Sequence, residues 1–190
     1  TSYRIKSFTI DSLNGTIYAG QAGANATTDG DVYACQPQVS GDADGLCETG
    51  EWSLSYNGSK EQITSLATDP FSGTIYAGEG WGSPDGDIYS CQPLTSGDAD
   101  GLCESGDWIL NYDGAQESID SLAVDSLNGT VYAGQGESAT GDGDIFYHFT
   151  GDSQIASDGT VNITGANGTI TFATSSTYSQ SRGSTNYLLK

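Results

Sequence analysis

The stretch Ser-Leu-Ala-Thr-Asp-Pro-Phe-Ser-Gly-Thr-Ile-Tyr-Ala-Gly at residues 65–78 is present in the chain in three versions. It returns at residues 121–134 as Ser-Leu-Ala-Val-Asp-Ser-Leu-Asn-Gly-Thr-Val-Tyr-Ala-Gly. An earlier copy at residues 7–20 reads Ser-Phe-Thr-Ile-Asp-Ser-Leu-Asn-Gly-Thr-Ile-Tyr-Ala-Gly. Copies spaced by more than fifty residues indicate one supersecondary unit that is repeated along an array.

Each copy, together with the residues that follow it, predicts a small antiparallel sheet. In the second copy we expect strands at residues 62–68, 74–78, 87–91 and 107–112, separated by turn-forming residues. No stretch places apolar residues at helical spacing, and the chain contains 27 glycines, so the fold class is all-β. Four short strands per repeat are typical of a β-propeller blade. We expect three propeller-like four-stranded blades followed by a C-terminal β-meander.

The motifs "SLAxD…GTIYAG", "GDIY" and the later "GDW" resemble the BNR/Asp-box family of β-propeller repeats over about residues 3–150. The resemblance implies a propeller fold, as in sialidase-like, sortilin-like and photosystem-assembly-factor-like proteins. The usual box, Ser-x-Asp-x-Gly-x-Thr-Trp, is interrupted here, because a Cys-bounded insertion precedes Gly106-Asp107-Trp108. Sialidase-like members hold a carboxylate with an arginine cluster, which Arg4 and Arg182 cannot supply. We therefore expect no enzymatic activity.

The predicted domain organisation has two parts. Residues 1–150 hold repeats at about 3–58, 59–114 and 115–150, and residues 151–190 form a capping segment and tail. The third copy lacks the Cys loop and the Trp strand, and His148 stands where the second copy has Cys91. Asp-Gly and Asn-Gly pairs predict a meander over 154–174, whereas the Ser/Thr-rich residues 174–186 are typical of a disordered tail. Three blades are too few for a usual closed propeller, so either the meander adds a fourth or exposed edges pair with other copies.

The charge and composition exclude several classes of partner. The net charge is −20 with only five basic residues, so nucleic acid, which requires Lys and Arg to neutralise phosphates, is excluded. No apolar run is long enough to span a membrane. The chain begins with Thr1 and shows no signal peptide, which we interpret as the processed N-terminus of an exported protein.

The four cysteines form two equally spaced pairs within Cys-Gln-Pro-x-x-Ser-Gly-Asp-Ala-Asp-Gly-Leu-Cys-Glu. The spacing predicts two disulfides, each closing a loop within its own repeat: Cys35–Cys47 and Cys91–Cys103. Zinc is the alternative, but short Cys pairs are absent and the chain has one histidine. Disulfides indicate an extracellular or cell-surface location.

Acidic residues inside and after each Cys loop resemble the start of a calcium loop, in which carboxylates alternate beside a glycine. The candidate calcium ligands are Asp42, Asp44, Glu48, Asp98, Asp100 and Glu104. The alternative is a polar hairpin tip, where Asp and Gly are favoured for turn chemistry. The Asp-Gly-Asp triplets at residues 29–31, 85–87 and 142–144 precede the same strand in every copy, which favours a structural turn over a unique active site.

Six asparagines lie in Asn-x-Ser/Thr glycosylation sequons. Four of them belong to Asn-Gly turns, so Asn25 and Asn162 are the better candidates for glycosylation.

These patterns predict an extracellular structural repeat protein, either a self-assembling surface or filament subunit or a module of a larger surface protein. Its expected partners are other copies of itself, with Tyr187, Leu188 and Leu189 anchoring the contact. The alternative function is a glycan-binding adhesin with Trp81, Tyr76 and Trp108 as an aromatic platform.

Overall fold

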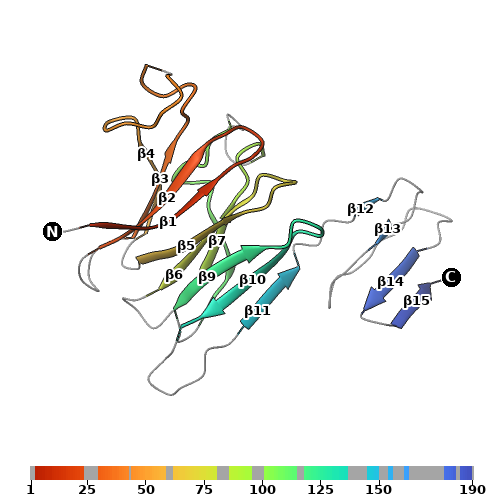
Figure 1. Ribbon diagram of the computed structural model, residues 1–190. Helices are drawn as coiled ribbons and strands as arrows, with labels where there is room; N and C mark the ends of the chain where they lie inside the picture. Colours follow the sequence, from red (N-terminus) through yellow and green to blue (C-terminus); the bar gives the residue numbers. More distant parts are fainter. Residues whose placement is uncertain are drawn as a thin grey trace. The chain divides into compact units, whose positions relative to one another are not determined.

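A computed structural model describes residues 3–23, 30–42, 44–58, 62–80, 86–95, 101–114, 118–136, 145–149, 154–155, 161–162, 178–182 and 185–189. The chain divides into two compact units, Thr1–Tyr147 and His148–Lys190. All regular structure in the described residues is β-strand, and the described part of the chain contains no helix that could span a membrane (Figure 1).

The first unit contains three sheets, one for each repeat. Sheet 1 has the strand order β1-β2-β3-β4 and consists of β1 (Arg4–Ile10), β2 (Ile17–Ala22), β3 (Asp31–Cys35) and β4 (Ser53–Asn57). Sheet 2 has the equivalent order and consists of β5 (Gln62–Thr68), β6 (Ile75–Gly80), β7 (Ile88–Cys91) and β8 (Ile109–Tyr112). Sheet 3 has three strands, namely β9 (Ile119–Val124), β10 (Thr130–Gln135) and β11 (Ile145–Phe149).

The strands of sheets 1 and 2 are antiparallel, and their bounds follow the four strands predicted for the second repeat. Sheet 3 is shorter than the expected four-stranded unit within the described residues, in keeping with the missing Cys loop and Trp strand of the third copy. The coarse expectation of an all-β fold of four-stranded antiparallel sheets is therefore confirmed for the first two repeats.

The three sheets stack through the first strands of the repeats, so that β5 contacts both β1 and β9 (Figure 1). Between sheets 1 and 2 lies a buried apolar cluster that includes Tyr18, Val32, Ile63 and Leu66. A second cluster lies between sheets 2 and 3 and is formed by Tyr76, Ile88, Ile119, Val131 and Ala133. Each cluster takes side chains from two consecutive repeats, so the stacking of neighbours forms the core, as in other repeat arrays.

The same turn joins the first two strands of every repeat. Its first residue is an aspartate, and its Oδ1 accepts the backbone N–H two residues on at 2.9–3.0 Å, in Asp11, Asp69 and Asp125. The backbone N–H of that aspartate donates to the carbonyl of the threonine that closes the turn, at 2.8–2.9 Å. The glycine before this threonine has φ between 71° and 79° in all three turns, a conformation that favours glycine. The repeated Asp-x-x-x-Gly-Thr pattern therefore encodes a turn.

In the second unit, the described residues form four strands. They are β12 (Gln154–Ile155), β13 (Val161–Asn162), β14 (Tyr178–Arg182) and β15 (Thr185–Leu189). β14 and β15 form an antiparallel hairpin, whereas β13 and β14 are parallel. The tail at 174–186, whose composition is typical of disorder, therefore contributes strand residues; in a hairpin the backbone hydrogen bonds do not depend on side-chain hydrophobicity. Most of the expected meander lies outside the described residues.

Candidate functional site

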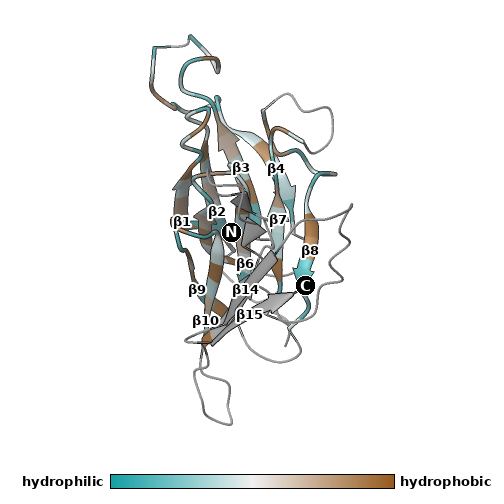
Figure 2. Cartoon of the chain, turned by 90° about the vertical axis from the view of Figure 1, so that its right-hand side faces the viewer, coloured by the Kyte–Doolittle hydropathy of each residue, from teal (hydrophilic) through white to brown (hydrophobic). Residues whose placement is uncertain are grey.

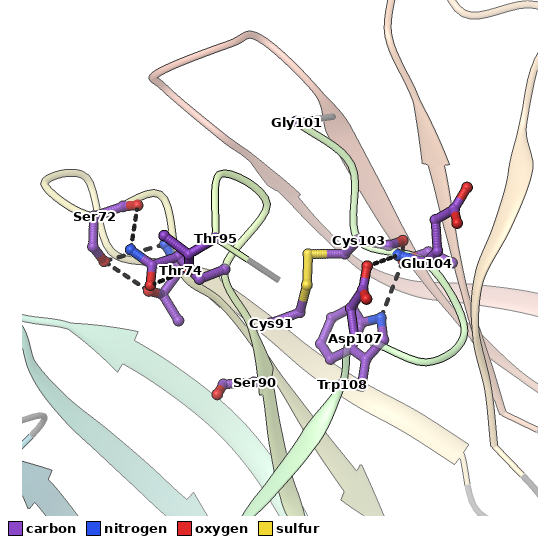
Figure 3. Close-up of a disulfide and its surroundings, with 12 residues drawn as sticks. Ser72, Thr74, Ser90, Cys91, Thr95, Gly101, Cys103, Glu104, Asp107 and Trp108 are labelled. Carbon is purple, nitrogen blue, oxygen red and sulfur yellow. Dashed lines mark hydrogen bonds between the residues drawn. A yellow bond between two sulfur atoms is a disulfide. The ribbon is translucent and has the colours of Figure 1, made fainter. Parts of the chain in front are cut away.

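Both disulfides have the pairing expected from the spacing. Cys35 bonds to Cys47 with Cα atoms 6.1 Å apart, and Cys91 bonds to Cys103 with Cα atoms 6.0 Å apart. Each bridge closes the loop that follows the third strand of its repeat, and Figure 3 shows the bridge of the second repeat. The described residues contain no free cysteine.

The two bridges differ in their surroundings. Cys91 and Cys103 both belong to the apolar cluster between sheets 1 and 2, and Trp108 packs against that cluster (Figure 3). Trp108 Nε1 donates to Ser55 Oγ of sheet 1, and the Ser55 hydroxyl donates to the Cys103 carbonyl. The second bridge therefore takes part in the contact between repeats, while Cys47 is only partly buried.

The acidic residues of the first Cys loop are used as turn acceptors. Asp42 Oδ1 accepts the Asp44 N–H at 3.3 Å, and Asp44 Oδ1 accepts the Leu46 N–H at 2.8 Å. Both carboxylates and that of Glu48 are exposed. Asp98 and Asp100 of the second loop lie outside the described residues, and Glu104 is exposed. No group of three or more His, Cys, Asp or Glu side chains suited to a metal ion occurs in the described part of the chain.

The residue before each tryptophan, Glu51 or Asp107, caps the turn after the Cys loop. Glu51 Oε2 accepts the Glu48 N–H at 2.7 Å, and Asp107 Oδ2 accepts the Glu104 N–H at 3.0 Å (Figure 3). The sequence "GDW" at residues 106–108 thus forms a turn cap that places Trp108 against the core.

A buried carboxylate lies among aromatic side chains between the first two sheets. Glu79 is almost fully buried, and Tyr56 forms hydrogen bonds with Glu79 and Tyr89. The Tyr56 ring lies 5.1 Å from that of Tyr89 and 5.6 Å from that of Trp108, measured between centroids. Burial above all, followed by the charge of Glu79, raises the pKa of Tyr56 far above its usual range. This cluster joins sheets 1 and 2, because Tyr56 comes from β4 and the other residues from the second repeat.

The aspartate before the third strand also has a structural role. Tyr33 Oη donates to Asp31 at 3.2 Å and Tyr89 Oη donates to Asp87 at 3.4 Å, at matching positions of the two repeats. Asp87 Oδ1 additionally accepts the Gly114 N–H at 3.1 Å. These contacts fit the structural reading of the repeated Asp-Gly-Asp triplet.

The three residues suggested as an aromatic platform for glycan binding lie in different surroundings. Tyr76 is buried beneath sheet 3, because it belongs to the apolar cluster between sheets 2 and 3. Trp108 packs between sheets 1 and 2, and Trp81 lies outside the described residues. The burial of Tyr76 depends on the neighbouring repeat, which a single repeat's sequence does not show.

The remaining predicted site residues are placed only by their backbone or not at all. Asn25 lies outside the described residues, and Asn162 is in β13. The backbone of Tyr187, Leu188 and Leu189 pairs with β14 of the same hairpin.

The most conspicuous surfaces are the outward faces of the first and last sheets, where apolar side chains are exposed. On sheet 1 these are Ile5, Phe8 and Ile10, and on sheet 3 they are Tyr132 and Ile145. The sequence pattern predicts contacts at strand edges and at the tail, and it does not indicate these faces. An alignment of the repeats places Ile5 at the position of Ile63 and Ile119, which are core residues in the following repeats. This match could have indicated that Ile5 lies on an apolar face.

No protein-family model matches the chain, and a search of curated proteins finds no relative. The features of this chain that bear on its function are the two exposed faces and the disulfide-stabilised repeats.

Proposed function

We propose that this protein is an extracellular structural repeat protein that assembles with other copies of itself, as a subunit of a surface layer or filament. The three sheets act as propeller-type blades of the Asp-box kind. The observation that carries the proposal is the pair of apolar faces at sheets 1 and 3, which hold side chains of the type that neighbouring sheets cover inside the array. Exposed apolar faces of this kind mark protein–protein interaction surfaces.

The disulfides support the extracellular part of the proposal. Each bridge closes a loop of 12 residues' separation, which adds about 3 kcal/mol in the chain-entropy model. Such bridges persist in oxidising compartments. A net charge of −20 keeps a secreted subunit soluble before assembly, and salt or counter-ions then reduce the repulsion between copies.

A structural role, rather than an enzymatic or glycan-binding one, fits the roles of the polar and aromatic groups. Glu79, Tyr56 and Tyr89 are engaged with one another between two sheets. Asp42 and Asp44 support a turn. Of the aromatic residues considered for glycan binding, Tyr76 is buried between sheets 2 and 3, and Trp108 is partly buried against the cluster between sheets 1 and 2.

Sedimentation velocity over a concentration series, with electron microscopy of the same samples, tests the proposal. We expect oligomers that grow with protein concentration and with salt, because salt screens the repulsion between acidic copies. A protein that stays monomeric at every concentration and ionic strength would contradict the proposal of self-assembly.

A further inference from the structure

The contact between consecutive sheets is built around one isoleucine and one glycine. A Cβ added to Gly20 of sheet 1 would lie 2.5 Å from Ile63 Cγ2 of sheet 2. In the same way, a Cβ added to Gly78 of sheet 2 would lie 2.6 Å from Ile119 Cγ2 of sheet 3. The isoleucine of each following repeat thus occupies the space that the glycine of the preceding repeat leaves free.

The register of the strands repeats this contact. A bulge separates Ile5 from Ser7 on β1, and an equivalent bulge separates Ile63 from Ser65 on β5. In sheet 3 the register shifts at the equivalent place: Gly134 pairs with Ser121, but the next residue of β10, Gln135, pairs with Ile119. Since a bulge re-aims the side chains beside it, the isoleucine keeps one orientation in the repeats.

At the two ends of the array, the same two positions are unfilled. Ile63 and Ile119 are fully buried, whereas Ile5 is 48% exposed, because no sheet of the described residues covers that face of sheet 1. A Cβ on Gly134 meets only Ser121 of its own sheet, a contact that Gly20 and Gly78 also make with their own serines. What Gly134 lacks is the isoleucine of a following repeat.

A second set of matched positions shows the same difference. Tyr18 with Val32, and Tyr76 with Ile88, are buried under the next sheet. Their equivalents on sheet 3, Tyr132 and Ile145, are 41% and 77% exposed. On the opposite face, Phe8 of sheet 1 is 60% exposed, while the equivalent Leu66 is buried against sheet 1. Both halves of the internal contact are therefore present at the ends without a partner sheet.

We infer that sheet 1 of one copy packs on sheet 3 of a second copy, with Ile5 seated over Gly134, and so continues the repeat stack from molecule to molecule. This inference names the interface of the self-assembly proposed above and rests on it. The occupant is a second copy, because residues 148–190 repeat only the Asn-Gly-Thr-Ile part of the motif, at 167–170, without the Tyr-Ala-Gly that supplies the glycine.

The charges of the two ends agree with this pairing. β1 carries Arg4 and Lys6, which are two of the five basic residues in a chain of net charge −20, and both are exposed. An approach through β1 therefore brings the most basic strand of one copy to an acidic neighbour, which favours this orientation over others.

The contact is head-to-tail, so it joins unlike faces of identical subunits. Such a heterologous contact yields a ring if the rotation closes and a filament if it does not. Two copies of three sheets would give a six-sheet ring, a number found among propellers, and repeated addition would give a filament.

A disulfide cross-link between two preparations tests the register. One preparation carries Ile5→Cys and the other Gly134→Cys. Because the described cysteines all form disulfides, the introduced cysteine supplies the free thiol in each preparation. The Cβ of Ile63 lies 3.2 Å from a Cβ placed on Gly20, and the Cβ of Ile119 lies 3.0 Å from a Cβ placed on Gly78. Both distances are slightly shorter than the Cβ–Cβ separation of roughly 3.5–4.5 Å in a disulfide. On mild oxidation we expect a covalent dimer in the mixture and none in either preparation alone.

The controls use the internal interfaces and a remote strand. Gly20→Cys with Ile63→Cys in one chain should form an intrachain bridge, which shows that the geometry permits the bond. Leu54→Cys, an exposed residue on the outer strand β4, should not cross-link with Gly134→Cys. A single chain carrying both Ile5→Cys and Gly134→Cys should give a ladder of multimers for a filament, or one closed species for a ring.

The outcomes separate the inference from the proposed function. Oligomers without the mixed cross-link overturn the head-to-tail interface but leave self-assembly standing. Monomers in every sample remove both. A further test places a charge on each face: Ile5→Asp and Ile145→Asp should each reduce association at least tenfold. Ile109→Asp should not, because Ile109, which is 62% exposed, lies on β8, the edge strand of sheet 2 (Figure 2). Equal loss in all three variants would contradict the inference.

Discussion

Trp108 Nε1 donates a hydrogen bond of 3.2 Å to Ser55 Oγ, and this bond joins the second repeat to the first. The Ser55 hydroxyl is buried and donates in turn to the carbonyl of Cys103. The disulfide loop of sheet 2 is therefore tied to sheet 1 through a side chain of β4. At the matching place on sheet 2, Asn111 is exposed, because the third repeat has no Trp loop to cover it.

The two disulfides should contribute unequally to stability. Replacing Cys35 and Cys47 by alanine should lower the free energy of unfolding by about 3 kcal/mol, because a loop constraint is lost. The Cys91 and Cys103 pair closes an equally long loop, so its constraint is the same, but its removal also empties space in the apolar cluster between sheets. We expect this variant to lose roughly 1 kcal/mol more. Urea denaturation of the two variants measures the difference; equal losses would contradict a role for the second bridge in stacking.

The sequence predicted what depends on local pattern. The strands of the second repeat and the Asp-x-x-x-Gly-Thr turn follow from alternation and turn chemistry within a few residues. The disulfide pairing follows from the repeated spacing. The burial of Tyr76 could not be predicted in this way, since it depends on sheet 3 packing over β6. The exposure of Ile5 could not be predicted either, because it depends on the stacking of the sheets, in which sheet 2 covers one face of sheet 1 and no described sheet covers the other.

The close approach of sheets predicts a position-dependent effect of glycine substitution. Gly20→Ala should destabilise the fold by about 1–3 kcal/mol, because the new methyl group meets Ile63 Cγ2 at 2.5 Å. Gly78→Ala should behave alike against Ile119. Gly134→Ala is the matched control: it meets the same kind of serine in its own sheet but no isoleucine, so its Tm should stay closer to that of the unmodified protein. Thermal unfolding at a low, monomeric concentration compares the three, and an equal Tm loss would disprove the isoleucine contact.

Asp11 should make stability fall as pH rises. Its side chain is buried against Gly73 of the next turn, and this burial raises the pKa of the carboxyl above 3.8, although the Leu13 N–H opposes the shift. The native state then holds the proton more tightly than the unfolded chain does. The contribution of Asp11 to stability therefore decreases as pH rises from 3.8 through the raised pKa, and the penalty remains above it.

Other carboxylates also titrate in this range, so the readout is a difference. Asp11→Asn keeps an oxygen that can accept the Leu13 N–H but does not ionise. We expect the stability of this variant, relative to the unmodified protein, to increase between about pH 3 and pH 7. A relative stability that stays constant across this interval would show that Asp11 titrates alike in both states.

The buried Glu79 should depend on Tyr56. Tyr56→Phe removes a hydrogen-bond partner from a buried carboxylate, and we expect a loss of about 1–3 kcal/mol at neutral pH. Glu79→Gln introduces the residue that the other repeats carry at this position, Gln21 and Gln135. In the Glu79→Gln background the same Tyr56→Phe change should cost less, because no buried charge is left without its partner. A double-mutant cycle measures the coupling, and strictly additive losses would rule it out.

Truncation distinguishes the two surfaces that could carry assembly. A chain ending after Ala173 lacks β14 and β15, and with them Tyr187, Leu188 and Leu189, the residues that sequence reasoning chose as anchors. The last strand of sheets 1 to 3 ends at Phe149, and all their residues up to Tyr147 belong to the compact unit Thr1–Tyr147. Both apolar faces are therefore kept in the truncated chain. We expect the truncated protein to keep the main thermal transition of the full chain and to sediment as oligomers of the same kind. If the truncated protein stays folded but sediments as a monomer where the full chain does not, the hairpin carries the contact between copies and the Ile5 and Ile145 faces do not.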